Sequence, residues 1–492
     1  MGFSISKFVR DGTIKRSMTG YSSEFEQESE SGLVEKFEDM LQARTSCFFD
    51  VEEIEALADY YLEKGNHAKA RKVIKLGLGI HPGSPAIMLR KAQAMVLIKE
   101  PKRALEILTY LEAAQPMNTE VLLFKAMVHR NLSDHEGTKS CLIKAIDTTP
   151  DNKEEIFLDL AFEQEMVEDY QGAIESLIQS LEINPNHEAS LFELGYCFDM
   201  AQELETGVTF FQKYLDGNPY SFVGWYNLAL CFEKLSLFEK AIESIDYCIA
   251  IKDDFTNAYT LKGNLYTSLD KDALAIDAYS ESIPFDQENP VVYVSIGECC
   301  ERLGRIEEAY VNYKKALELD PNYVDALMGM GALKEIEQDF TSSISFYKEA
   351  LAQDDANLDN WHIMAELLLK VGKIADAEKA YDFMSRTFVH DEESWAALAE
   401  IKSSKQQYAE AVDIIEEAMS LVTGTNDLQW HLAKHLIKLG KTTQAADVLA
   451  EALSKDPSGS KFFISIFPDA AQIANIAALI DIYAQAPSKD EL

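Results

Sequence analysis

The chain has 492 residues and carries 83 acidic against 45 basic side chains, a formal net charge of −38. A surface this acidic repels nucleic acid and anionic membranes, so we expect neither as a partner. No apolar run approaches the roughly 18 residues that a membrane-spanning helix needs, and the first residues show no signal-peptide pattern. Seven scattered cysteines without a C-x-x-C pair fit a reducing compartment. We therefore expect a cytoplasmic protein.

The first predicted segment, residues 1–32, begins mildly basic and becomes acidic and serine-rich. Its apolar content is too low for it to fold alone, so we expect a flexible tail. Residues 33–50 carry an amphipathic pattern that predicts one capping helix. At the end of this helix, Asp50 and Glu53 have the spacing of a capping box that opens the next helix.

Residues 51–459 repeat with a period of 34. Stepping by 34 from Gly297, with one inserted residue, reaches a small residue in each of twelve units, and a second small series follows twelve places later. We expect two helix backbones to approach closely at these marker places, because a larger side chain would overpack them. The markers are Ala58, Ala92, Ala126, Ala161, Gly195, Ala229, Gly263, Gly297, Gly331, Ala365, Ala399 and Ala433.

Each unit has the pattern of a helix, a tight turn and a second helix, as in Pro290 to Tyr323, where Gly304 marks the turn. Large residues, such as Trp225 and Trp361, recur four places before the marker, and a proline closes seven units. The predicted units begin at Val51, Pro85, Thr119, Glu154, Glu188, Phe222, Thr256, Pro290, Val324, Leu358, Glu392 and Asn426.

A unit of this length and pattern resembles the tetratricopeptide repeat family. The resemblance covers residues 51–459 and implies an all-α fold, a right-handed α-solenoid of about twelve helix-turn-helix repeats with flanking capping helices. The pentatricopeptide family has a nearby period, but the steady spacing of 34 and the acidic charge argue against it. Residues 460–492 would supply C-terminal capping helices and a tail, with Pro468 breaking the first of these helices.

The resemblance also implies a concave groove lined by the second, fifth, ninth and twelfth places of each first helix. In repeats three to six the fifth and ninth places are all large and apolar or aromatic, which predicts a peptide-binding stripe. The twelfth places nearby predict an acidic rim. The stripe is Leu123, Met127, Leu158, Phe162, Phe192, Tyr196, Tyr226 and Leu230, and the rim is Glu165, Asp199 and Glu233.

These patterns favour a non-catalytic scaffold whose groove binds a protein or peptide with apolar anchors and basic residues. The flanks on either side of the repeats are too short for a catalytic domain, so we expect no catalytic residues and no cofactor. The alternative is a chaperone-like or regulatory subunit that holds one client, autoinhibited by residues 1–20, which mix apolar and basic side chains as a groove ligand would. The oligomeric state stays open.

One histidine pair was considered as a metal site. His431 and His435 are four residues apart and therefore share one face of a helix. No carboxylate or cysteine is placed in the sequence to complete a site, so we expect no metal.

Overall fold

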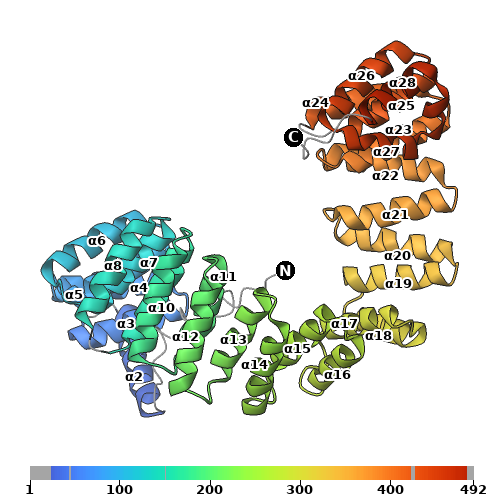
Figure 1. Cartoon of the computed structure of the whole chain (residues 1–492). Coiled ribbons are helices and arrows are strands. Elements are labelled where there is room, and N and C mark those ends of the chain that lie inside the picture. Colours follow the sequence, from blue (N-terminus) through green and yellow to red (C-terminus); the bar gives the residue numbers. More distant parts are fainter. Residues whose placement is uncertain (1–23, 44–45, 150, 423–426, 485–492) are drawn as a thin grey trace. The chain divides into compact units, whose positions relative to one another are not determined.

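The structure is a computed structural model that describes residues 24–43, 46–149, 151–422 and 427–484 (Figure 1). The described residues form helices and the connections between them, and they contain no strand, which confirms the all-α fold. The chain divides into two compact units, one ending at Leu269 and the other beginning at Asp270. Each unit is a stack of helices in which the second helix of a pair also contacts the first helix of the next pair, as α4 (His67–Ile80) contacts α5 (Pro85–Leu97) and α18 (Ile306–Leu319) contacts α19 (Val324–Ile336).

The 24 helices from α3 to α26, taken two at a time, give twelve consecutive pairs. The first helices are α3 (Val51–Glu63), α5 (Pro85–Leu97), α7 (Thr119–Asn131), α9 (Lys153–Glu165), α11 (Glu188–Met200), α13 (Phe222–Lys234), α15 (Thr256–Ser268), α17 (Pro290–Arg302), α19 (Val324–Ile336), α21 (Leu358–Lys370), α23 (Glu392–Ser404) and α25 (Asp427–Lys438). The second helices are α4 (His67–Ile80), α6 (Pro101–Ala114), α8 (His135–Thr148), α10 (Tyr170–Ile183), α12 (Leu204–Gly217), α14 (Phe238–Ile251), α16 (Asp272–Ser282), α18 (Ile306–Leu319), α20 (Phe340–Gln353), α22 (Ile374–Thr387), α24 (Tyr408–Leu421) and α26 (Thr442–Lys455).

The turn inside each pair places the fifteenth residue of the unit in the left-handed region. Glycine occupies this place in four units and a larger residue in the others, although left-handed backbone costs such a residue roughly 1–2 kcal/mol. The conformation therefore does not depend on the presence of glycine. The fifteenth residues are Gly65, Lys99, Ser133, Glu168, Gln202, Ser236, Asp270, Gly304, Gln338, Gly372, Gln406 and Gly440.

At two of the marker glycines the nearest atoms are side chains, whereas the sequence predicted a close approach of two backbones. A Cβ added to Gly297 would lie 2.7 Å from Cε1 of Tyr313, and one added to Gly195 would lie 2.7 Å from the amide group of Asn227. The closest neighbours of these two markers are therefore side chains of adjacent helices rather than another backbone. Tyr313 and Asn227 are each 1% exposed, so the small residue makes room for a fixed, buried group.

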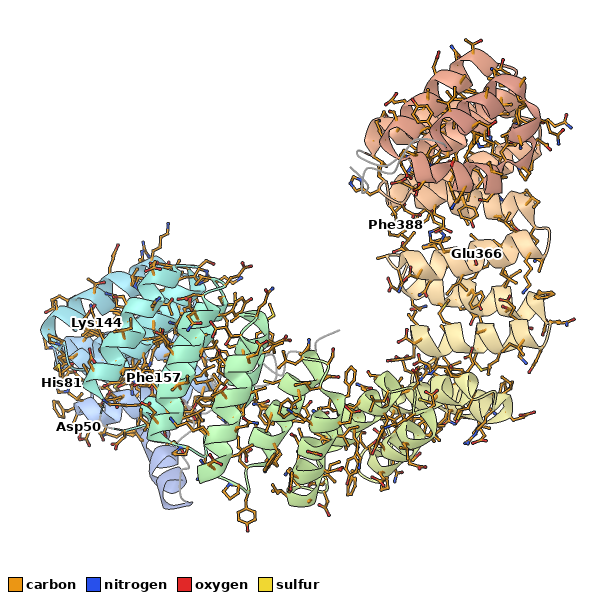
Figure 2. All side chains as sticks on the ribbon, in the orientation of Figure 1. Asp50, His81, Lys144, Phe157, Glu366 and Phe388 are labelled. Carbon is orange, nitrogen blue, oxygen red and sulfur yellow. The ribbon has the colours of Figure 1, made fainter. Side chains whose placement is uncertain are left out.

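The large aromatic residues near the start of each first helix tie that helix to the preceding turn. Nε1 of Trp225 donates to the carbonyl of Pro219 over 2.9 Å, and Nε1 of Trp361 donates to that of Asp355 over 3.0 Å. Both acceptors lie six residues before the donor, at the place where a proline closes many units. This bond explains how a unit closed by Asp355 keeps the turn without proline. Figure 2 labels Phe157 at the equivalent place of α9.

The ends of the chain differ in detail from the predicted boundaries. Helix α2 (Glu24–Ala43) begins before residue 33, and its Phe37 is buried against the first pair. The predicted capping box is confirmed, because Asp50 accepts from the backbone N–H of Glu53 over 2.8 Å and Glu53 accepts from that of Asp50 over 3.0 Å.

At the C-terminal end, α27 (Ser460–Ile466) ends before Pro468, as predicted, and the short helix η2 (Pro468–Gln472) leads into α28 (Ala474–Ala484). The face of α28 that carries Ile476 and Ile480 packs on the last pair and covers its apolar core.

Candidate functional site

The predicted peptide-binding stripe lies on α7, α9, α11 and α13 of the first unit. Within this unit α9 contacts α11 and α11 contacts α13, so the first helices lie side by side. Phe162, Phe192, Tyr226 and Leu230 are partly exposed and pack on one continuous core that runs through these three helices. The structure therefore brings half of the predicted stripe together on one surface.

The other four residues of the stripe differ in their surroundings. Leu158 is only 2% exposed and is part of the core, so we leave it out of the binding surface proposed below. Leu123 and Met127 pack on two separate clusters nearer the N-terminus. Tyr196 is 43% exposed, and its ring meets that of Tyr170 edge-on at 6.5 Å. The stripe is thus concentrated on α9, α11 and α13.

An aromatic cluster forms the centre of this surface. The ring of Phe192 lies 6.4 Å from that of Tyr226 and 6.3 Å from that of Phe222, and Phe255 lies 5.1 Å from Tyr226 and 5.3 Å from Phe222. All four side chains are partly exposed. Such rings provide a large apolar contact area with little conformational freedom left to lose on binding.

Two members of the aromatic cluster were missed by the sequence analysis. Phe222 is the first residue of its repeat and Phe255 directly precedes α15, so neither stands at a groove place of the repeat pattern. The only sequence signal was their aromatic character beside a helix start. A shallow cavity of about 420 Å³, lined in part by Leu191, Tyr214 and Phe222, adjoins the cluster.

The predicted acidic rim is less uniform in charge than the sequence suggests. Asp199 forms an ion pair with Lys234 over 3.0 Å. Glu165 accepts a hydrogen bond from the thiol of Cys197 over 3.6 Å. Burial raises the pKa of Glu233, although Lys234 opposes the shift. Part of the rim charge is therefore already balanced within the protein.

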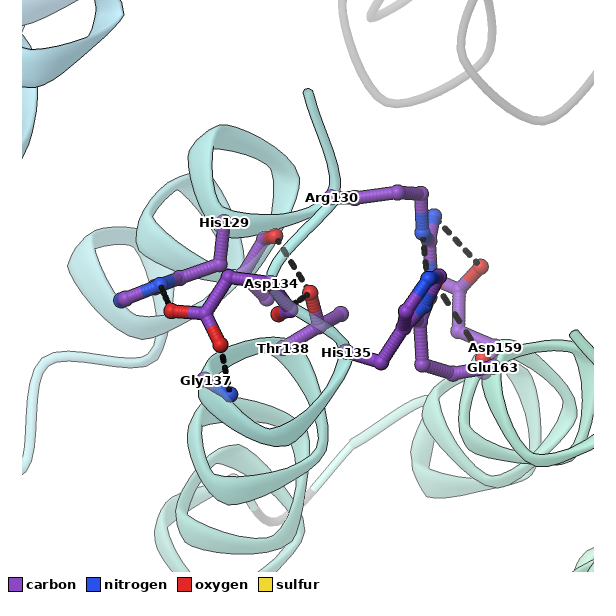
Figure 3. Close-up of polar contacts among 9 residues, drawn as sticks. His129, Arg130, Asp134, His135, Gly137, Thr138, Asp159 and Glu163 are labelled. Atoms are coloured by element: carbon purple, nitrogen blue, oxygen red, sulfur yellow. Dashed lines mark hydrogen bonds and ion pairs between the residues drawn. The ribbon is translucent and has the colours of Figure 1, made fainter. Parts of the chain in front are cut away.

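A buried charge cluster lies beside the stripe and joins the third helix pair to the fourth (Figure 3). Glu163 of α9 is 2% exposed and contacts Nε of Arg130 at 2.9 Å and Nδ1 of His135 at 2.6 Å. Arg130 also reaches Asp159 at 3.8 Å, and burial raises the pKa of that carboxyl. A buried carboxylate is stable only when it is paired in this way, so we interpret the cluster as structural.

Next to this cluster, Asp134 caps the N-terminus of α8. It accepts from the backbone N–H of Gly137 over 3.0 Å and contacts Nδ1 of His129 at 2.7 Å. The hydrogen bond from Gly137, and after it the one with His129, lowers the pKa of Asp134. The cap fixes the turn between α7 and α8 and orients His135 toward Glu163.

In the second unit, the prediction that no carboxylate accompanies the histidine pair was wrong. Glu400 of α23 brings a carboxylate to His431 and His435 of α25, and one ligand atom from each of the three residues lies within 4.8 Å of the others. Residue spacing within α25 could not indicate this carboxylate, because it belongs to the preceding repeat.

Comparison with known proteins identifies the repeats. Residues 290–323 and 392–421 match models of the tetratricopeptide repeat. The chain thus contains tetratricopeptide repeats, whose fold is typically a non-catalytic scaffold for protein–protein interaction. None of the described helices is long and apolar enough to cross a membrane.

Particular relatives share low sequence identity with the chain. The TPR repeat-containing protein YpiA of Bacillus subtilis is 21% identical over 385 residues, which are 76% of this chain and 88% of that protein. Anaphase-promoting complex subunit 3 of Schizosaccharomyces pombe is 25% identical over 141 residues, 29% of this chain and 21% of the subunit. The crystal structure of yeast Tom70 aligns with a TM-score of 0.40 at 16% identity, covering 87% of this chain and 98% of Tom70.

Proposed function

We propose that this protein is a non-catalytic scaffold that binds a peptide segment of a partner protein on the surface of α9, α11 and α13. The observation that carries the proposal is the partly exposed aromatic cluster of Phe192, Phe222, Tyr226 and Phe255. A contiguous apolar surface that spans several elements usually marks a contact site.

The helices that carry this surface have further exposed apolar side chains. Tyr196 is 43% exposed, and Met166 and Met200, at the C-terminal ends of α9 and α11, are 54% and 42% exposed. Flexible methionine side chains adapt to ligands of different shape, whereas aromatic rings act as rigid anchors. The surface therefore suits a segment with two or three large apolar side chains in succession.

The charge around the surface favours basic residues in the ligand. The chain as a whole carries a net charge of −38, and Glu165 lies near Tyr196 and Glu233 near Tyr226. Asp199 is already paired with Lys234, so a basic ligand residue would have to compete for it. We infer a partner segment that alternates apolar anchors with Lys or Arg.

The test is selection from a random peptide library on the immobilised full-length protein. Enriched peptides should carry aromatic or aliphatic anchors and basic residues, and Tyr196→Ala should weaken their binding about tenfold or more. Tyr110→Ala is the matched control, because Tyr110 is 60% exposed on the second helix α6. Equal weakening by both variants, or enrichment of acidic peptides, would contradict the proposal.

The alternative of a chaperone-like or regulatory subunit that holds a single client remains a second proposal. Its autoinhibitory segment, residues 1–20, lies outside the described residues. Deletion of this segment tests that role directly, because a ligand that leaves the groove should let the selected peptides bind more tightly.

A further inference from the structure

A compact set of possible metal ligands lies between α23 and α25 of the second unit, whereas the proposed peptide surface belongs to the first unit. His431 and His435 are one helical turn apart and point to the same side of α25, where Glu400 of α23 reaches them. Oε1 of Glu400 lies 3.5 Å from Nε2 of His435 and 3.7 Å from Nδ1 of His431. Four-coordinate zinc with bonds of roughly 2.1 Å places its ligand atoms about 3.4 Å apart. The two distances from the carboxylate to the imidazole nitrogens are therefore close to those of a zinc site, and the three ligand atoms all lie within 4.8 Å of one another.

The imidazole groups of this set are available to a metal. His435 is fully buried, with 0% of its surface exposed. Among the residues that the structure describes, neither ring nitrogen of His435, nor Nδ1 of His431, has a hydrogen-bond partner.

Lys434 holds the carboxylate when no metal is bound. Its Nζ lies 2.6 Å from Oε1 of Glu400, and its side chain is 10% exposed. An incoming cation must displace this ammonium group, which weakens binding without removing any ligand. Glu400 is 35% exposed, so an ion can approach the site along this carboxylate.

We propose that Glu400, His431 and His435 form a binding site for a divalent transition-metal ion of the zinc type, which links α23 to α25. Two imidazole nitrogens and one carboxylate oxygen are a ligand set that Zn²⁺ accepts, with a fourth position left for water or a partner's side chain. Mg²⁺ and Ca²⁺ prefer an all-oxygen set, so this site selects against them. The ion would clamp the last two repeats to each other.

The site is tested on the full-length protein after treatment with a chelator. Co²⁺ titration followed by visible absorption, and Zn²⁺ titration by calorimetry, should both show one ion bound per chain. Mg²⁺ at the same concentration should give no heat of binding. Glu400→Gln and His431→Gln should each weaken Zn²⁺ binding at least tenfold, since even the partners of metal ligands contribute roughly 10- to 100-fold.

Two further variants separate coordination from unfolding. His390→Gln removes an exposed histidine of the same unit and should leave Zn²⁺ binding unchanged. Lys434→Met removes the competing ammonium group and should strengthen Zn²⁺ binding, an effect that loss of structure cannot produce. The proposal is overturned if the wild type binds no Zn²⁺, or if Glu400→Gln binds it as tightly as the wild type does.

Discussion

Gly297→Ala shows how strictly a marker place restricts side-chain size. In the middle of α17, an added Cβ would lie 2.7 Å from Cε1 and 2.8 Å from Cδ1 of Tyr313. The ring cannot move away easily, because it is 1% exposed and its hydroxyl donates to Glu301 over 3.0 Å. Gly329 of α19 packs against the same ring. Tyr313 is therefore enclosed by glycines of two successive repeats.

Two opposing effects set the size of the change. Alanine is favoured over glycine inside a helix by about 0.5–1 kcal/mol, whereas an extra carbon in a packed core costs about 1–3 kcal/mol. Because Tyr313 is fixed on several sides, we expect the upper half of that cost. The net destabilisation should be about 1–2.5 kcal/mol, which corresponds to about a 5- to 60-fold increase in local opening.

Hydrogen exchange with mass spectrometry on the full chain is the suitable assay, since long repeat arrays need not unfold in two states. Peptides from α17 and α18 should exchange faster in Gly297→Ala by the factor given above. Gly79→Ala is the matched control: no atom lies within 4 Å of its added Cβ, so exchange in α4 should slow. Unchanged or slower exchange in α17 would refute the packing argument. Tyr313→Leu should destabilise the Gly297→Ala protein less than it destabilises the wild type. In the alanine variant, removing the ring also removes its clash with the added Cβ.

Four other outcomes are expected. Gln202→Gly should slow hydrogen exchange around its turn, because Gln202 has φ of 59° and glycine adopts this conformation without strain; faster exchange would contradict this. Burial raises the pKa of Glu233. The contribution of this carboxyl group to stability is therefore present in acid and is lost as the pH rises through its pKa. Glu233→Gln should accordingly raise the melting temperature near neutral pH but not in acid. Of the seven cysteines, all among the described residues, only Cys47 is not buried, so brief alkylation followed by peptide mapping should label Cys47 first. Deletion of residues 1–20 should strengthen binding of the selected peptides if this segment occupies the groove; unchanged affinity would count against autoinhibition.

The helix pairs were predictable because the places that are buried in each repeat recur with the repeat period. The predicted start of a unit coincides with the start of a helix at Pro290, and it differs by one residue at Glu154, where α9 begins at Lys153. A position that must be small or apolar in every copy gives twelve independent observations of one environment. Single propensities are far weaker evidence than such a repeated constraint.

The turn conformation was not predictable in the same way. Gly304 marks it clearly, but the equivalent residue is Lys99 in one repeat and Glu168 in another, and both still have positive φ. A search for glycine finds only the units in which the strain is relieved. The geometry comes from the packing of the two helices, so the residue type in the turn does not predict it.

For a related reason, the sequence could not predict which residues of the stripe are exposed. Leu158 and Phe192 stand at the same place of successive repeats, yet Leu158 is 2% exposed and Phe192 is partly exposed. The difference depends on the neighbouring side chains rather than on the place itself. Phe255 enters the aromatic cluster from a turn, outside the helical periodicity on which the prediction was based.

Contacts between repeats follow fixed offsets that periodicity alone does not contain. A residue at the ninth place meets one 31 positions later, as Asp59 meets Arg90 and as Glu400 meets His431. A residue at the twelfth place meets one 35 positions later, in the pairs Asp199 with Lys234, Glu335 with Lys370 and Ser403 with Lys438. A period of 34 shows which residues are equivalent, but these offsets show which residues touch. With the offset of 31, the carboxylate partner of His431 would have been found from the sequence, so the same rule can locate polar contacts between other repeats of this chain.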